Sequence, residues 1–404
     1  MEKSEGITIP HEKPWRYEEG EYTVTRGSAW SGPGCHLGCG VLMYTDKDGK
    51  LVKVEGDPEN PMTEGRLCVR CLDMPEIVNH KDRLTYPMKR ARADRGKNKW
   101  ERVSWDEAYD IVEREFNAIK DEYGAESVVF IHGTGRDIAP WQSRLCWSFG
   151  SPNYGNVLSG NACYLPRVAG MAATTGSFWV ADCSQEFADR YDNPQWKPPG
   201  VIFVWGNNPL VSNADGNVGH WMVDCMRRGS RFVVVDPRIT WIASKADLFL
   251  RLRPGTDAAL ALAIINVMIE DGTYDHEFVE NWTYGFEDLA AAARAYPAEK
   301  AEEITWVPAA HIREAARKFA TGKHSALAWG LALDQNVNGP QAAMALIALL
   351  CITDNLDVPA GCVLSGVSTT DSQKNRYREG ASLMTPDLWE KRIGAKEYPG
   401  ICDI

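Results

Sequence analysis

The chain has 404 residues, a formal net charge of −11, 44% hydrophobic residues and 25% charged residues. This length exceeds the size at which a single hydrophobic core stops growing, so two or more domains are expected. The acidic balance argues against a general nucleic-acid binder, and the longest apolar runs, Ala258 to Ile269 and Ala342 to Thr353, are too short to span a membrane.

The first residues are polar and interrupted by prolines, which predicts an N-terminal arm over residues 1–28 that lies on the protein surface. No apolar signal segment or twin-arginine motif precedes Ser31. We therefore expect a cytoplasmic protein without a direct membrane span.

Residues 29–90 contain four cysteines with the spacing of metal ligands. Cys35 and Cys39 form a C-x3-C pair, and Cys68 and Cys71 form a C-x2-C pair. Between the pairs, residues 41–57 alternate apolar and polar side chains around Asp48-Gly49, which predicts a β-hairpin. The hairpin is expected to bring the two pairs together.

Three kinds of site use such cysteines. Disulfides are disfavoured, because the other seven of the 11 cysteines are scattered singly, as in a reduced protein. A structural zinc site and an iron–sulfur cluster both take four cysteine ligands. The spacing alone leaves these two alternatives open.

The following segment is expected to begin an α/β domain over residues 91–195. Ser104, with Glu107 three positions later, forms a capping box, and apolar residues recur at helical spacing up to Ile119, which predicts an amphipathic helix. A short β-rich run from Ser127 then ends in a Gly-containing loop with His132 and Arg136.

Repeated strand–loop–helix units predict a doubly wound α/β fold over residues 196–365. The predicted strands lie in residues 200–209, 230–238, 246–257 and 324–339, with helices at 219–228, after 257 and at 342–353. Residues 366–404 contain no recognisable closing element and are expected to form an incomplete tail.

Loops at the carboxyl ends of such strands gather at one edge of a sheet, where ligands bind. Here they are residues 206–209, 236–238 and 254–257, which are rich in Gly, Asn, Asp and Pro. A tight turn explains each loop by itself, whereas three successive units with polar endings favour a nucleotide site.

Cys163 stands alone in a Gly-rich stretch, ahead of a small-residue helix. A buried apolar thiol is one interpretation. The other is a thiolate at a helix N-terminus that acts as a nucleophile or a soft metal ligand.

Seven motifs in order carry a family resemblance: GRLCVR, WERVSWDEA, GSPN, NACYLPRVAG, WGNNP, VVDPR and LRPGTDAALALA. From about Ser31 to about Gly361 the chain resembles the molybdopterin oxidoreductases of the dimethyl sulfoxide reductase family. The opening WSGPGCHLGCGVL and the CVRC doublet look most like catechol dehydroxylase-like and acetylene hydratase-like members.

The resemblance implies a 4Fe-4S cluster in the cysteine module and α/β domains that hold a molybdenum bis(molybdopterin guanine dinucleotide). By position, Cys163 matches the protein ligand to molybdenum and Arg70 the basic residue between cluster and pterin. His132 and Arg136 match the pterin and substrate space. The positions that match guanine dinucleotide contacts are Gly206, Asn208, Pro209, Asp236, Arg238, Gly255, Thr256 and Asp257.

The chain departs from the family pattern at the cluster, because Ser31 and Gly32 stand where the family has a histidine or cysteine ligand. Either Cys71 replaces that ligand, or the cluster is altered or absent. Family members are also usually longer. The implied function is two-electron oxygen-atom or hydroxyl transfer on a small, catechol-like substrate, with electrons from a ferredoxin-like subunit. The alternatives are a non-redox hydratase or transhydroxylase, and a truncated, catalytically silent fragment.

Overall fold

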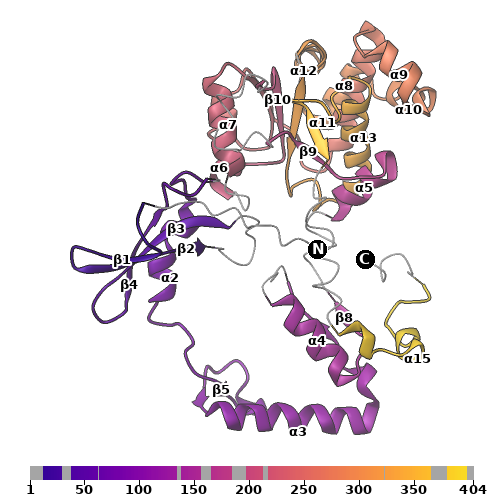
Figure 1. The fold of residues 1–404 in the computed structure, drawn as a ribbon. Helices are drawn as coiled ribbons and strands as arrows, with labels where there is room; N and C mark the ends of the chain where they lie inside the picture. The colour runs from indigo at the N-terminus through magenta and orange to yellow at the C-terminus, as the bar shows by residue number, and fades with distance from the viewer. Residues whose placement is uncertain are drawn as a thin grey trace, which may run out of the picture.

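The computed structural model describes residues 12–29, 38–61, 63–133, 138–155, 165–183, 197–212, 217–322, 324–364 and 380–397. Figure 1 shows three parts: a small β-sheet module, a helical part that contains α3 and α4, and a larger α/β domain. Among the described residues, no helix is both long and apolar enough to cross a membrane.

The cysteine module is built on one antiparallel sheet. Its strands are β1 (Arg16–Glu19), β2 (Tyr22–Ala29), β3 (Cys39–Thr45) and β4 (Leu51–Gly56), in that order. The predicted hairpin is confirmed, since β3 pairs with β4 and Asp46 Oδ1 accepts hydrogen bonds from the turn amides of Asp48 and Lys50. Two short helices, α1 (Val69–Leu72) and α2 (Met74–Val78), then pack on β4.

The expectation of a surface arm over residues 1–28 is wrong for the part of it that forms strands. β1 and β2 complete the sheet, and the Arg26 guanidinium makes ion pairs with Asp57 at 2.8 Å and with Glu59 at 3.0 Å. The Asp57 carboxylate is buried. These contacts anchor β2 to the loop after β4, so the polar composition of this segment reflects exposed strands and one buried ion-pair network.

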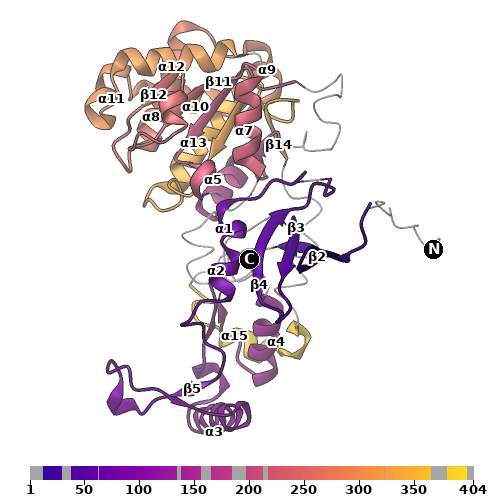
Figure 2. The same cartoon turned by 90° about the vertical axis from the view of Figure 1, so that its left-hand side faces the viewer.

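The second part follows a short hairpin of β5 (Met88–Lys89) and β6 (Glu101–Arg102). Helix α3 (Trp105–Tyr123) begins as predicted, because Ser104 accepts a hydrogen bond from the Glu107 amide. No residue of α3 is buried. Its Phe116 packs against an aromatic cluster, which includes Phe130, Trp147, Phe149 and Tyr154. Figure 2 shows α3 at the end of the molecule opposite the large α/β domain.

The aromatic cluster is built on two parallel strands and a helix. β7 (Phe130–Ile131) pairs with β8 (Tyr154–Gly155), and α4 (Ala139–Phe149) joins them. Residues 380–397, in the segment predicted to be an incomplete tail, contain a short helix: Trp389, on α15 (Pro386–Glu390), packs edge-on against Trp147. The described part of the tail therefore packs into the same cluster.

The large domain confirms the predicted doubly wound fold. β10 (Val201–Trp205), β11 (Arg231–Val235), β12 (Leu248–Leu250) and β13 (Ser325–Trp329) are parallel and lie in the order β12-β11-β10-β13. Alternate residues of β10 face the two sides. One side packs on α5 (Leu165–Thr175), α8 (Asp257–Asp271), α12 (Ala309–Thr321) and α13 (Gly339–Cys351), and the other on α7 (Asn217–Arg227).

The strand order creates a switch point between β10 and β13. From β10 the chain proceeds through β11 and β12 on one side, and β13 returns to pair with β10 on the other. Loops that leave two neighbouring strands in opposite directions open a crevice at their carboxyl ends, where α/β proteins bind ligands. The loops after β10 and β13 begin at Gly206 and Gly330.

Candidate cofactor site

Three of the four predicted cluster ligands converge. Cys39 begins β3, Cys68 precedes α1 and Cys71 lies on it, and the Cys71 thiol hydrogen-bonds with both other thiols. The hydrogen bond with Cys39 and then burial raise the pKa of Cys71, whereas Cys68 and the Arg70 charge act in the opposite direction. A metal centre would replace these shared protons, since thiolates are the ligating form.

The fourth predicted ligand, Cys35, lies outside the described residues. Among the residues that the structure describes, no group of three or more His, Cys, Asp or Glu side chains is placed to hold a metal ion. The three thiols nevertheless supply the donor chemistry of an iron–sulfur or zinc centre, and Cys39 and Cys71 are both buried. The donor atoms present are therefore of the kind that a four-thiolate centre uses, and Cys35 stays the predicted fourth ligand.

Arg70 lines a cavity of about 140 Å³ between the cysteine module and the α/β domain. Cys68 belongs to the same lining, as do Pro209 on α6 (Pro209–Ser212) and His220 on α7. An ion pair of 3.5 Å between Arg66 and Asp224 joins the two parts beside it. Arg70, the predicted cluster ligand Cys68 and Pro209 of the predicted nucleotide edge thus line one cavity.

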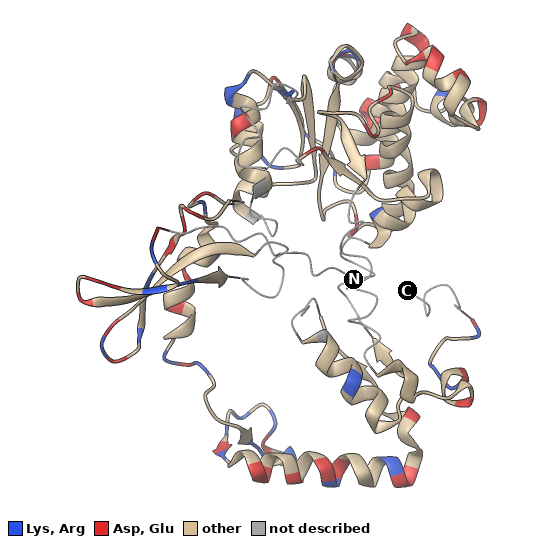
Figure 3. Cartoon of the chain, in the orientation of Figure 1, with Lys and Arg blue, Asp and Glu red and all other residues tan. Residues whose placement is uncertain are grey.

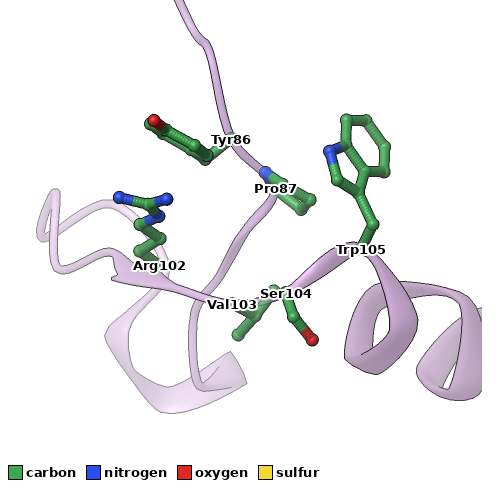
Figure 4. A pocket seen from close by; sticks show the side chains of 6 residues that line it. All are labelled: Tyr86, Pro87, Arg102, Val103, Ser104 and Trp105. Carbon is green, nitrogen blue, oxygen red and sulfur yellow. The ribbon is translucent and has the colours of Figure 1, made fainter.

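A larger hollow of about 470 Å³ lies on the surface at β5, β6 and the start of α3. Figure 4 shows Tyr86 and Arg102 side by side at one end and Trp105 at the other. The Arg102 guanidinium lies 3.1 Å from the centre of the Tyr86 ring. The residues that line this hollow include none of the predicted site residues, so its size alone does not identify it as the site.

The predicted nucleotide loops gather at the carboxyl edge of the parallel sheet. Gly206 has φ +58°, and its amide donates to the Val235 carbonyl. Buried Asp236 accepts a hydrogen bond of 2.7 Å from the Arg238 amide, while the Arg238 side chain points into solvent. Backbone groups of these loops and the Arg238 guanidinium are therefore available at this edge, as a phosphate-bearing ligand requires.

Asp257 is buried at the start of α8, where its Oδ1 accepts a hydrogen bond of 2.8 Å from the Trp205 indole. Burial raises the pKa of this carboxyl, and the Trp205 hydrogen bond acts against the rise. Thr256 donates its hydroxyl to the Arg253 carbonyl. Gly255 has φ +84° and open space around it apart from Asn336. Asp257 and Thr256 thus shape this turn, and Gly255 leaves room for a ligand.

One loop of the edge had no predicted site residue. The 330–338 loop, which follows β13, touches both neighbouring nucleotide loops: the Gly330 amide donates to the Trp205 carbonyl, and Asn338 Nδ2 donates to the Gly255 carbonyl at 3.3 Å. The 330–338 loop is rich in Gly and Asn, like the other loops of this edge. This composition was the sequence signal that could have identified it as part of the site.

His132 follows β7 and is buried beside β8. The Tyr154 hydroxyl lies 2.7 Å from His132 Nε2, and the two rings stack. Burial lowers the pKa of His132, so the neutral imidazole is favoured at neutral pH. Arg136 and Cys163 lie outside the described residues, in the segments that follow β7 and β8.

Comparisons with known proteins agree with this geometry. Residues 33–80 match the family "Molybdopterin oxidoreductase Fe4S4 domain", and residues 83–375 match "Molybdopterin oxidoreductase". The acetylene hydratase of Syntrophotalea acetylenica is 33% identical over 375 residues, which cover 90% of this chain and 48% of the relative. Formate dehydrogenase H of Escherichia coli (strain K12) is 30% identical, over 85% of this chain and 46% of the relative.

Among solved structures, acetylene hydratase from Pelobacter acetylenicus superposes with a TM-score of 0.72 at 28% identity, over 93% of this chain and 49% of that one. The chain thus spans about half the length of the curated relatives it matches. Both the fold and the ordered motifs agree with the family matches. The chain belongs to the molybdopterin oxidoreductase family and carries its Fe4S4 domain.

Proposed function

We propose that the chain forms the cluster-bearing and cofactor-binding part of a molybdopterin-dependent oxidoreductase. The observation that supports the proposal is the cavity that Cys68 and Arg70 share with Pro209, because residues proposed for the cluster and for the nucleotide line the same space. Residues 29–90 would hold the 4Fe-4S cluster and residues 91–195 the first part of the molybdopterin domain. Residues 196–365 would bind the guanine dinucleotide of a bis(molybdopterin guanine dinucleotide).

The proposed roles follow from the chemistry of each side chain. Cys163 holds molybdenum as a thiolate, and Arg70 binds the electron-rich pterin beside the cluster. His132, neutral at pH 7 and held by Tyr154, moves a proton at Nε2, and Arg136 orients the substrate. When bound, the cofactor supplies two-electron exchange of an oxygen atom or hydroxyl group.

The substrate class that we propose is a small, catechol-like phenol, and electrons would reach the 4Fe-4S cluster from a ferredoxin-like subunit. Every described cysteine is a free thiol, which supports a reducing compartment such as the cytoplasm. The anaerobic conditions that keep such clusters intact would be the working conditions of the enzyme.

Metal analysis of anaerobically purified protein tests this proposal. We expect iron and molybdenum together. Cys71→Ser should lower iron, and Cys163→Ala should abolish turnover while iron is retained. Cys351→Ala removes a thiol on α13 and serves as the matched control. Full activity of Cys163→Ala would sink the assignment. Iron without molybdenum would indicate a silent cluster-carrying fragment, and zinc alone a zinc ribbon.

A second function, non-redox hydration, is favoured by the similarity to acetylene hydratases in both sequence and structure. Hydration and transhydroxylation need no net electron supply. Turnover in the absence of any added reductant or oxidant would support them. Strict dependence on an electron donor would support the oxidoreductase.

A further inference from the structure

Arg167 and Asp334 form a buried ion pair that none of the roles above uses. Arg167 lies on the first turn of α5, and Asp334 belongs to the 330–338 loop, 167 residues later in the chain. Arg167 Nε lies 2.7 Å from Asp334 Oδ2, and the Arg167 backbone amide donates to Asp334 Oδ1 at 2.9 Å. The Asp334 side chain is fully buried and the Arg167 side chain is 13% exposed, so solvent screens the pair only weakly.

The same guanidinium reaches the predicted nucleotide loop. Arg167 Nη1 donates to the Trp329 carbonyl at 3.0 Å, and Asn207 Nδ2 donates to the same oxygen at 3.4 Å. Asn207 directly follows Gly206 in the loop after β10. One carbonyl at the end of β13 therefore links Arg167 to the loop at the switch point.

The 330–338 loop is packed tightly between the two predicted nucleotide loops. A Cβ on Gly330 would lie 2.4 Å from the Gly206 carbonyl oxygen, and Asn338 donates to the Gly255 carbonyl on the other side. A loop in such close contact transmits any shift of its own to both neighbours. Asp334, inside this loop, is fixed by Arg167.

We infer that Arg167 is a positioning residue for the guanine-nucleotide edge: paired with Asp334, it fixes the Trp329 carbonyl and the 330–338 loop against the loops at Gly206 and Gly255. This inference rests on the proposed function for the identity of the nucleotide. The pair also neutralises a buried carboxylate next to an edge that receives phosphate groups, which an unpaired Asp334 charge would repel.

The plain alternative is that the pair only stabilises the fold, as many buried ion pairs do. A set of three variants separates the two roles. Arg167→Met leaves Asp334 as a buried, unpaired carboxyl. Arg167→Met combined with Asp334→Asn removes both charges and should restore much of the stability, because breaking a buried pair costs more than replacing it. Arg167→Lys keeps the charge.

The measurements are the thermal midpoint of unfolding and the Kd of GDP, added to the full-length protein purified without the molybdenum cofactor. We expect Arg167→Met to lower the midpoint and to weaken GDP binding roughly 10- to 100-fold, the factor for one lost hydrogen bond to a charged group. In the double variant the midpoint should recover while the Kd remains raised. For Arg167→Lys, the midpoint and the Kd of GDP should both lie between those of wild type and Arg167→Met. Arg317→Met, which removes a surface ion pair with Asp271, should leave the Kd unchanged.

Two results overturn the inference. If the Kd follows the midpoint in every variant and recovers in the double variant, the pair is only structural. If Arg167→Met binds GDP as wild type does, Arg167 does not position the edge, and the proposed function is untouched. Failure of wild-type protein to bind GDP would instead remove the guanine nucleotide itself, and with it both this inference and that part of the proposed function.

Discussion

Three carboxylates are buried at the carboxyl edge of the parallel sheet, and each has its own donor. Asp236 accepts from the Arg238 amide, Asp257 from the Trp205 indole, and Asp334 from Arg167. Buried polar groups are costly unless they are hydrogen-bonded, so these donors account for their presence. The edge thereby holds acidic residues without exposing free negative charge to an anionic ligand.

Asp334 should make stability depend on pH in the mildly acidic range. Burial raises the pKa of Asp334 from 3.8 to about 6, although Arg167 acts against the rise. The folded state then binds the proton more tightly than the unfolded state. The free energy of unfolding should therefore fall as the pH rises from about 4 to about 6, by up to about 3 kcal/mol from this group, and stay level above.

Urea unfolding between pH 4 and 7 measures this dependence. Asp334→Asn should remove the pH dependence that this carboxyl contributes. The difference in free energy of unfolding between the variant and wild type should therefore change between pH 4 and 6. Asp271→Asn, at a surface carboxylate, is the matched control. Equal pH profiles for wild type and Asp334→Asn would contradict the prediction.

Gly330 should tolerate no side chain. Gly330→Ala would place a Cβ 2.4 Å from the Gly206 carbonyl oxygen and 2.8 Å from the Asn207 Cα, both backbone atoms. We expect a loss of stability of roughly 1–3 kcal/mol from overpacking, together with weaker GDP binding.

Gly229→Ala is the comparison for this prediction. Gly229 has φ +93° and no atom within 4 Å of an added Cβ, so the substitution costs backbone strain of roughly 1–2 kcal/mol without crowding the edge. The Kd of GDP should stay at its wild-type value there. Weakened binding in both variants would show that lost stability, rather than crowding at the edge, was responsible.

At the scale of elements, α3 and α8 show how differently two well-predicted helices contribute. Most residues of α8 are buried, and it forms part of the main core. In α3 no residue is buried, and Tyr109 and Val112 are exposed. Helical periodicity predicted α3, and the apolar run from Ala258 to Ile269 predicted α8, while their burial depends on the neighbours that the fold brings to them.

Because packing contributes little to α3, its N-cap should matter locally. Ser104→Ala removes the acceptor for the Glu107 amide and should cost about 1 kcal/mol. Hydrogen exchange of the α3 amides should become about fivefold faster, while exchange in the β10–β13 sheet stays unchanged. Ser104→Asp keeps an acceptor and should exchange like wild type. Unchanged α3 exchange in Ser104→Ala would refute the prediction.

At the scale of the whole molecule, charge joins the cysteine module to the α/β domain. Figure 3 shows acidic and basic residues spread over all parts of the chain. The ion pair between Arg66 and Asp224 crosses from the module to α7 beside the cavity that holds Arg70. Both side chains are largely shielded, at 29% and 13% exposure, so this contact should be less screened than a fully exposed pair.

Charge reversal tests this contact. Arg66→Glu or Asp224→Arg alone places like charges together and should loosen the contact by about 1 kcal/mol, seen as faster hydrogen exchange in α1 and α7. The double variant, Arg66→Glu with Asp224→Arg, restores opposite charges and should recover slow exchange. If the double variant exchanges as fast as the singles, the pair does not hold the two parts together.

The sequence by itself determined the local elements and the chemistry at their ends. The four strands of the large sheet, the Ser104 cap and the hairpin between the cysteine pairs follow from periodicity and turn residues. The family was also recognisable from motifs that occur in order along the chain. Cys68 and Cys71 meet Cys39 because a single hairpin separates them in the chain. This contact could therefore be predicted without any information about how distant segments pack.

Only the tertiary structure decided which distant segments meet. The pairing of β13 with β10, the contact of Arg167 with Asp334 and the packing of Trp389 on Trp147 join residues more than 100 positions apart. The tertiary structure also decided that β1 and β2 join the sheet of the cysteine module, because their polar residues suit a surface arm and an exposed strand equally well. Such contacts depend on the total free energy of packing, and local sequence patterns do not encode which surfaces will find each other.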